Sequence, residues 1–258
     1  MDEGPARAPS PAAERGTADA PEPPATTEPP APAETARQRW RLVLARSADA
    51  PALVGRELAD AFEEALEASD LPVLRPPGKA RGRVAFGAPL PATMAAENEL
   101  ADVLMTTFVP SWLVRERLTD RLPAGWRLVD VFDVWIGAPS LAGQVGAADY
   151  RIDLGAVDAE TVAGACAAVM ASDALPRERV KGASTVPYDL RPLVVDVGVS
   201  DPGPPVVLRA RTRFHPALGT GRPEEVVASL GDHIGQPLAV RSIVRERLIL
   251  IDDLPSGQ

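Results

Sequence analysis

Residues 206–214, Val-Val-Leu-Arg-Ala-Arg-Thr-Arg-Phe, alternate small or apolar side chains with arginines. Successive side chains of a β-strand point to opposite faces, so Arg209, Arg211 and Arg213 are predicted to share one face. A strand with one apolar and one polar face is typical of an antiparallel sheet that packs on a core on one side only. This stretch therefore predicts a half-exposed antiparallel sheet.

The residues on either side of this strand predict a complete set of elements. Before it, residues 150–154 and 193–199 are predicted strands, and Asp158 is expected to cap the helix that follows it. After it, Pro223 suits the start of a second helix, and residues 238–251 form a closing strand. The predicted order is strand, helix, strand, strand, helix, strand.

The first half of the chain repeats this order. Its first helix is the clearest element, because Leu58, Phe62 and Leu66 lie four apart with acidic residues between them. Ser111 is expected to cap the second helix. The order is that of the ferredoxin-like split βαβ fold, whose antiparallel sheet carries both helices on one face. The predicted elements are strands at 40–45, 82–88, 99–109 and 126–136, and helices at 54–68 and from 111 onward.

The predicted fold class is therefore α+β, a tandem of two ferredoxin-like split βαβ modules with antiparallel sheets. The modules are placed at 38–137 and 149–254, with a linker over 137–148. Residues 1–37 hold 9 of the 28 prolines and almost no large apolar side chains. Such a segment cannot bury enough apolar surface to offset the entropy of ordering, which predicts a disordered Pro/Ala-rich tail. A docking segment for a proline-reading domain is the alternative.

Composition excludes several classes of protein. The formal net charge of the 258 residues is −9, which argues against a strong nonspecific nucleic-acid binder. The single cysteine, Cys166, and the two histidines, His215 and His233, are too few for a closed zinc site or a [4Fe–4S] cluster held by this chain alone. We expect a buried, inert thiol and structural or surface histidines. No signal-peptide pattern and no apolar run of about 18 residues occurs, so a cytoplasmic protein without a membrane span is expected.

Several short motifs carry a resemblance to a known family. In the second half these are Lys181-Gly182, Tyr188-Asp189-Leu190-Arg191-Pro192-Leu193 and Gly221-Arg222-Pro223-Glu224-Glu225-Val226. In the first half they are Gly87-Ala88-Pro89-Leu90-Pro91 and Glu97-Asn98-Glu99-Leu100-Ala101-Asp102. The linker region contributes Ala138-Pro139-Ser140-Leu141, and directly after it comes Asp149-Tyr150. With these motifs, the chain over about residues 39–252 resembles a divergent member of the radical-SAM-associated family defined by domain of unknown function 2344.

The resemblance implies a partner rather than a self-sufficient enzyme. Such proteins are encoded beside, or fused to, radical-SAM proteins, so this chain would be an accessory subunit that helps to bind substrate or stabilise the catalytic subunit. The partner would hold the [4Fe–4S] cluster, S-adenosylmethionine and, where it has a cobalamin-binding domain, cobalamin. The chain departs from the family at Ser47–Ala50 and Arg75–Ala80, where the usual histidines are absent. This loss suggests a specialised biosynthetic pathway.

An RNA- or tRNA-binding module acting in RNA modification is the alternative function. Ferredoxin-like sheets can stack bases on exposed aromatic residues. The strand at 206–211 has no aromatic residue, and this lowers the expectation of RNA binding.

Two groups of basic residues are candidates for substrate or partner binding. The first, from the family motifs, is Lys181, Asp189, Arg191 and Arg222, with Arg191 expected in an extended segment where its side chain can pair with Asp189 or a ligand. The second is the stripe of Arg209, Arg211 and Arg213, joined by Arg241, Arg245 and Arg247 if these share its face. Guanidinium groups suit carboxylate and phosphate recognition. A structural ion pair and a solvated sheet face are the respective alternatives.

The acidic residues Glu97, Glu99 and Asp102 form a weaker candidate. Glu97 and Glu99 are expected on one face of a strand, where paired carboxylates can perform acid–base chemistry if one pKa is raised. Two solvated charges are the favoured interpretation, because no histidine or metal is placed to assist. No catalytic residue and no metal ligand is therefore assigned to this chain.

Overall fold

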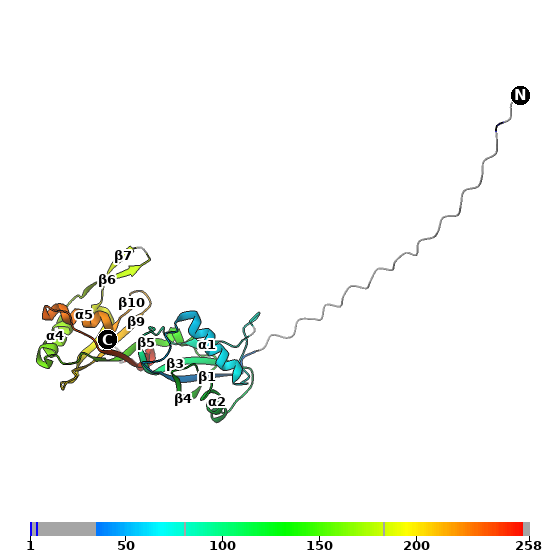
Figure 1. Ribbon diagram of the computed structural model, residues 1–258, viewed down its shortest axis with the longest axis horizontal. Helices are drawn as coiled ribbons and strands as arrows, with labels where there is room; N and C mark the ends of the chain where they lie inside the picture. The colour runs from blue at the N-terminus through cyan, green and yellow to red at the C-terminus, as the bar shows by residue number, and fades with distance from the viewer. Residues whose placement is uncertain (2–3, 5–34, 80, 183, 255–258) are drawn as a thin grey trace. The chain divides into compact units, whose positions relative to one another are not determined.

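The computed structural model describes residues 1, 4, 35–79, 81–182 and 184–254 (Figure 1). The predicted disordered tail, residues 1–37, lies almost entirely outside the described residues. The described chain is α+β, with one large, mainly antiparallel sheet and few helices. The predicted α+β class with antiparallel pairing is confirmed at this level.

The first half contains four strands and two helices in the predicted order. The strands are arranged β4-β1-β3-β2, and each neighbouring pair is antiparallel. The elements are β1 (Gln38–Arg46), α1 (Gly55–Ala68), β2 (Val84–Phe86), β3 (Ala95–Met105), α2 (Ser111–Leu118) and β4 (Trp126–Val134).

The second half repeats this arrangement with additions. Its strands lie in the order β11-β5-β9-β8, again with antiparallel neighbours, and short β10 pairs with β9. The elements are α3 (Leu141–Gln144), β5 (Val145–Asp153), α4 (Ala159–Ala171), β6 (Pro176–Lys181), β7 (Ser184–Asp189), a 3-10 turn η1 (Arg191–Leu193), β8 (Val194–Asp201), β9 (Val207–His215), β10 (Gly219–Thr220), α5 (Pro223–Ile234), β11 (Ser242–Leu250) and a second turn η2 (Ile251–Asp253).

The two halves share one sheet and one core. Strands β3 and β11 pair in parallel over a short contact, with Val244 opposite Ala95 and Arg245 opposite Ala96. This contact joins the two four-stranded arrangements and β10 into a nine-stranded sheet. The buried apolar residues of both halves form one continuous cluster. The halves are therefore one folded body, with their junction at β3 and β11.

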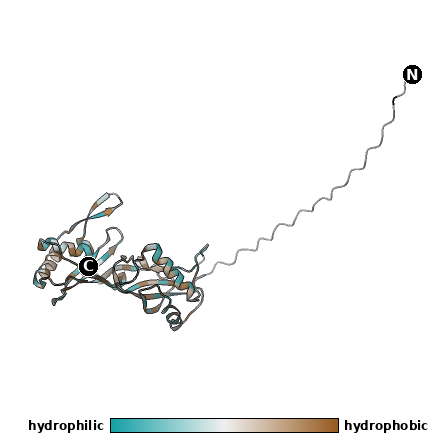
Figure 2. Ribbon diagram, viewed as in Figure 1, coloured by the Kyte–Doolittle hydropathy of each residue, from teal (hydrophilic) through white to brown (hydrophobic). Residues whose placement is uncertain are grey.

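The predicted helices form for the predicted reasons. In α1, Leu58, Phe62 and Leu66 are buried, and Figure 2 shows polar and apolar residues side by side on this helix. Asp158 caps α4, because its carboxylate accepts a hydrogen bond from the backbone N–H of Thr161 at 2.8 Å. Pro223 occupies the first turn of α5, where its missing N–H costs no hydrogen bond.

Two local predictions about element ends are wrong. Ser111 does not cap α2, because Pro110 takes the N-cap position and Ser111 is the first helical residue. The predicted linker over 137–148 is not irregular throughout. Strand β5 begins at Val145, because Val145, Ala147 and Ala148 are buried and pair with β11.

The hairpin of β6 and β7 is not predicted by the sequence pattern. It forms a separate two-stranded sheet that stands away from the large sheet (Figure 1). Its six residue pairs run from Pro176 with Asp189 to Lys181 with Ser184. Gly182, at φ +61°, lies in the connecting turn, which needs a left-handed residue. Its strands contain two prolines, and proline is depleted in strands, so the sequence pattern does not predict strands here.

Phe62 tests the core of the first half. Its ring, 1% exposed, meets Phe86 and Trp126 edge-on, each at 5.1 Å between ring centroids. Phe62→Ala is expected to lower the free energy of unfolding by about 3–5 kcal/mol, through lost burial and a cavity. Phe108→Ala, at a ring that is 77% exposed, is the matched control and should stay within about 0.5 kcal/mol. Urea unfolding followed by circular dichroism measures both, and equal effects would contradict this account of the core.

Candidate functional site: a cleft between the two halves

A cleft of about 580 Å³ opens where the two halves meet. Its volume lies within the range of small-molecule pockets. One wall comes from the β2–β3 loop of the first half, the other from β9, β10 and the start of α5, and the floor from β5 and β11. We call it the junction cleft; it is lined by Pro89, Leu90, Pro91, Met94, Tyr150, Phe214, Thr220, Gly221, Arg222, Pro223, Glu224, Glu225 and Arg245.

A buried ion pair lies beneath the cleft. Arg245 donates from Nε and Nη2 to the two carboxylate oxygens of Glu99, at 2.6 and 2.5 Å. Both side chains are only 2% exposed. Burial alone would lower the pKa of Arg245, but the charge and hydrogen bonds of Glu99 outweigh it and raise that pKa. The charged Arg245 thus links β11 to Glu99 of β3 at the junction.

The loop that forms the first wall is held by arginines from both halves. Arg245 Nη1 donates to the backbone carbonyl of Pro89 at 2.9 Å. From the first half, buried Arg46 donates to the carbonyls of Pro91 at 2.9 Å and Ala92 at 2.5 Å. These bonds to charged donors are stronger than neutral ones, so the loop is fixed at two places.

The second wall depends on close packing at Gly221. A Cβ atom there would lie 2.8 Å from the carbonyl oxygen of Leu193 and 2.8 Å from Cβ of Thr212, so a side chain does not fit. The Thr212 hydroxyl also donates to the Gly221 carbonyl at 2.7 Å. This packing brings exposed Arg222, the N-cap residue of α5, to the rim of the cleft.

Tyr150 completes the floor next to the ion pair. Its side chain is 3% exposed. Burial raises the pKa of Tyr150, because it disfavours the phenolate more than nearby Arg245 favours it. The hydroxyl is therefore protonated at neutral pH. The cleft combines this polar floor with apolar walls at Leu90, Met94 and Phe214.

Asp189 and Arg191 have a structural role. Asp189 Oδ1 accepts hydrogen bonds from the backbone N–H groups of Leu175 and Arg191, at 2.7 and 2.9 Å. The Arg191 guanidinium donates to the carbonyls of Met170 and Ser172, at the end of α4, at 2.9 and 3.1 Å. It satisfies carbonyls that have no partner within the helix.

Two expectations for Arg191 are therefore wrong. It begins the turn η1 instead of lying in an extended segment, because Asp189 caps its N–H and the fixed φ of Pro192 suits a 3-10 turn. Its side chain pairs with backbone carbonyls and not with Asp189. Lys181 lies at the end of β6 in the hairpin. Among these motif residues, Arg222 lines the cleft.

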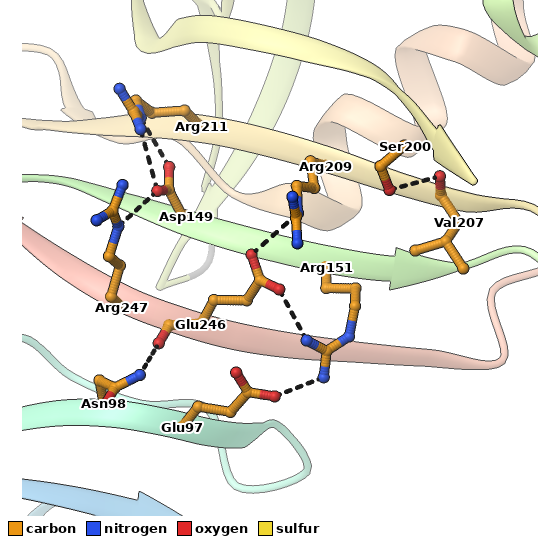
Figure 3. Close-up of polar contacts among 10 residues, drawn as sticks. All are labelled: Glu97, Asn98, Asp149, Arg151, Ser200, Val207, Arg209, Arg211, Glu246 and Arg247. Atoms are coloured by element: carbon orange, nitrogen blue, oxygen red, sulfur yellow. Dashed lines mark hydrogen bonds and ion pairs between the residues drawn. The ribbon is translucent and has the colours of Figure 1, made fainter.

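The arginine stripe lies on one face of β9, as predicted. Leu208, Ala210 and Thr212 are buried, whereas the arginines between them are not. The two guanidinium nitrogens Nε and Nη2 of Arg211 bind the carboxylate of Asp149 at 2.7 and 3.0 Å. The same carboxylate accepts a bond from Arg247 at 2.8 Å (Figure 3).

A second carboxylate neutralises the rest of this face. Glu246 accepts from Arg151 at 2.7 Å and lies 3.4 Å from Arg209. Arg151 also donates to Glu97 at 2.6 Å, which extends the network to β3 (Figure 3). Arg213 is half-buried, and within the described chain its side chain forms no ion pair. Two of the three stripe arginines, Arg209 and Arg211, are therefore matched by carboxylates on neighbouring strands, which supports the alternative of a solvated sheet face.

Burial and hydrogen bonding oppose each other at Asp149. Burial by itself would raise the pKa of Asp149, but the hydrogen bonds and charges of Arg211 and Arg247 outweigh it and lower the pKa below its usual range. The carboxylate thus contributes stability when it is ionised.

The prediction that Arg241, Arg245 and Arg247 share one face of the last strand is wrong. Arg241 precedes β11, which begins at Ser242, and the other two arginines lie on different faces. A register shift occurs between Arg245, opposite Tyr150, and Arg247, opposite Asp149. The extra residue at this bulge turns Arg245 into the junction and leaves Arg247 on the charged face.

A similar shift separates the predicted acidic pair. Between Leu44 opposite Glu99 and Arg46 opposite Ala96, β3 has one residue more than β1. Glu97 therefore joins the charged face, whereas Glu99 is buried beneath the cleft. The expectation that both lie solvated on one face is wrong.

Asp102 is also buried, between two arginines. It accepts hydrogen bonds from Arg39 and Arg41, both at 2.8 Å from Nε. Arg39 also donates to the carbonyls of Ala138 and Pro139, at 2.7 and 2.9 Å. This carboxylate therefore anchors the segment between the halves.

The cysteine and the histidines lie outside the cleft. Cys166 is buried in α4, and burial raises the pKa of its thiol to about 11, so the thiolate is scarce at neutral pH. His215 Nδ1 accepts from the N–H groups of Ala217 and Leu218 in a turn, and His233 bonds the Ser229 carbonyl near the end of α5. In the described residues no three His, Cys, Asp or Glu side chains are grouped as metal ligands.

The burial of two arginines at the cleft is not predicted by the sequence. Arg46, which holds the first wall, is not singled out, and Arg245 is expected on the exposed arginine stripe. Arginines are usually exposed, so the pattern gives no sign of burial. Leu90 and Pro91 belong to one of the motifs of the family resemblance, and this motif is the sequence feature that points to the first wall of the cleft.

None of the helices in the described part of the chain has the length and apolar character needed to cross a bilayer.

Glu99→Gln tests the buried pair. It leaves Arg245 charged and buried without a countercharge, which is expected to cost about 3–5 kcal/mol of unfolding free energy. Glu97→Gln, on the same strand, removes a carboxylate that is 44% exposed and should cost about 0–1 kcal/mol. Chemical denaturation of both variants gives the comparison, and a Glu99→Gln protein as stable as Glu97→Gln would refute the assigned role.

Asp149→Asn tests the pH dependence of the charged face. A lowered native pKa gives stability that is present above the unfolded pKa, about 3.9, and is lost as pH falls through the native pKa. The variant should be less stable than the wild type at pH 7, and the gap should shrink progressively below about pH 5. Thermal melts from pH 7 to pH 3 measure the gap. A constant gap would show that Asp149 does not act through its charge.

Comparison with known proteins identifies a family. No curated protein matches the sequence significantly. Solved structures that resemble the chain include "Crystal Structure of a Cbf5-Nop10-Gar1 Complex" (TM-score 0.46, 9% identity, covering 80% of this chain and 49% of that chain). Another is "Crystal structure of the archaeal box H/ACA sRNP Nop10-Cbf5 complex" (TM-score 0.39, 12% identity, 79% and 47%). This chain spans about half the length of those chains.

A family model described as "Uncharacterized protein conserved in bacteria (DUF2344)" matches residues 39–215. The match includes the first wall of the cleft and ends before the motif at 221–226. Because it covers more than half of the sequence, the chain belongs to the family of uncharacterised bacterial proteins defined by domain of unknown function 2344.

Proposed function

We propose that this protein is an accessory subunit of a radical-SAM enzyme and that the junction cleft helps to bind the substrate. One observation carries the proposal: two motif stretches of the family resemblance, 87–91 and 221–226, are far apart in sequence but supply opposite walls of one cleft. The buried Glu99–Arg245 pair, which includes a further motif residue, lies beneath them. A pre-formed pocket with apolar walls and a few polar groups suits a binding role.

The catalytic cofactors belong to the partner in this proposal. The radical-SAM protein encoded nearby would hold the [4Fe–4S] cluster, S-adenosylmethionine and, if it has a cobalamin-binding domain, cobalamin. This chain would contribute substrate binding and stabilise the catalytic subunit, within a specialised biosynthetic pathway. The division of roles rests on the family resemblance.

The proposal extends to the architecture of the subunit. We infer two ferredoxin-like modules, at 38–137 and 149–254, because the strand orders β4-β1-β3-β2 and β11-β5-β9-β8 place corresponding strands in corresponding positions. In this arrangement the cleft lies between the modules, a common place for a ligand site.

Co-expression tests the partnership. The tagged chain should capture the neighbouring radical-SAM protein, and the complex should convert substrate faster than the radical-SAM protein alone. An unrelated radical-SAM protein serves as the control for nonspecific capture. The absence of both a complex and a change in turnover would refute the proposal.

A further inference from the structure

We propose that residues 29–32 of this chain, Pro29-Pro30-Ala31-Pro32, bind to a groove between exposed aromatic rings of the first half. The described residues that line this groove all differ from those that line the junction cleft, so the inference goes beyond the proposed accessory role. It derives from the exposure of the rings, from the point where the N-terminal segment joins the folded body, and from the composition of that segment.

Large apolar side chains are exposed together at this groove. Phe108 and Trp135 are 77% and 75% exposed, and Ile136 is 42% exposed. Exposed apolar side chains that are grouped in this way mark interaction sites. The groove has a volume of about 260 Å³, which is below that of ordinary small-molecule pockets and suits single side chains of a peptide. We call it the aromatic groove; it is lined by Arg37, Gln38, Phe108, Asp133, Val134, Trp135 and Ile136.

The fold holds the two sides of the aromatic groove in place. The buried side chain of Gln38 accepts a hydrogen bond at Oε1 from the backbone N–H of Val109 at 2.8 Å, and its Nε2 donates to Asp133 at 3.3 Å. Gln38 therefore ties the segment before α2 to the end of β4. The ring of Trp135 lies over Gly137, where an added Cβ would come within 2.6 Å of it. A pre-formed groove pays little ordering entropy when a peptide binds.

The N-terminal segment joins the folded body beside this groove. The backbone N–H of Arg37 donates to the Met105 carbonyl at 2.8 Å, and Arg37 itself lines the groove. Residues 29–32 precede Arg37 by only five to eight positions. An extended chain spans about 3.3 Å per residue, so residues 33–36 give a reach of about 13 Å. So short a tether gives residues 29–32 an effective concentration at the groove on the order of mM.

The composition of residues 29–32 matches the chemistry of the groove. Three of the four residues are prolines. Such segments favour the polyproline II conformation, which is already extended and loses little entropy on binding. Grooves lined by aromatic residues recognise this conformation, and the indole N–H of Trp135 can donate to one of its carbonyls. The segment is too poor in apolar residues to form a core of its own, but here the groove supplies the apolar surface.

Nuclear magnetic resonance of the full chain tests the contact from the side of the N-terminal segment. The probe is a capped synthetic peptide of residues 25–36, which reports the amide signals of Ala31 and Ala33 away from the groove. In the full chain these two signals should differ from those of the peptide. Trp135→Ala should move them to the peptide positions, because the groove loses one side. Trp112→Ala is the matched control and should leave them unchanged, since this ring is 62% exposed but is not among the residues that line the groove.

Replacement of the prolines tests the same contact from the side of the groove. A triple variant with alanine at positions 29, 30 and 32 should shift the indole signal of Trp135 and leave those of the buried Trp40 and Trp126 unchanged. The wild-type peptide, added to this variant, should move the Trp135 signal back toward its original position. Alanine at positions 5, 9 and 11, three prolines at the far end of the same segment, is the matched control and should have no effect.

Two results would overturn the proposal. The first is coincidence of the full-chain and peptide signals, or equal effects of the control variants. The second is loss of the shifts on about tenfold dilution, because a contact within one chain does not depend on concentration and such a loss would identify a second copy as the occupant. Trp135 is mostly exposed, so its replacement should leave the melting curve unchanged. The proline variant decides even if it does not, because it leaves residues 38–254 intact.

Discussion

The ion pair between Glu99 and Arg245 is the interaction on which the junction depends. Both groups are buried, so each needs the other to offset the loss of hydration. Their strands belong to different halves and share two residue pairs of parallel sheet. The same guanidinium holds the Pro89 carbonyl, so one side chain joins the sheet and shapes the wall of the cleft.

Two bulges decide which charges reach this junction. One extra residue in β3 and another in β11 move Glu99 and Arg245 to the buried side while Glu97, Glu246 and Arg247 stay on the charged face. The sheet consequently has two distinct ionic systems. The network in Figure 3 is shared among several side chains and is partly solvated, whereas both members of the buried pair are only 2% exposed.

Much of the fold is predictable from the sequence, and the physical reason is periodicity. The four-residue spacing of Leu58, Phe62 and Leu66 and the alternation in β9 depend on local geometry alone. The bulges break that periodicity, so the parity argument failed for Arg245 and for Glu99. The cleft is predictable from the sequence only in part. Its motifs can be recognised, but their position on one cleft depends on tertiary packing at Gly221 and on buried arginines whose burial no local pattern predicts.

The separation of the buried pair along the chain has a consequence for biosynthesis. Arg245 follows Glu99 by 146 residues. At about 5–20 residues per second, a ribosome makes Glu99 roughly 7–30 s before its countercharge. The ion pair at the junction can therefore form only after β11 has been synthesised, and the bond from Arg245 to the Pro89 carbonyl is subject to the same delay.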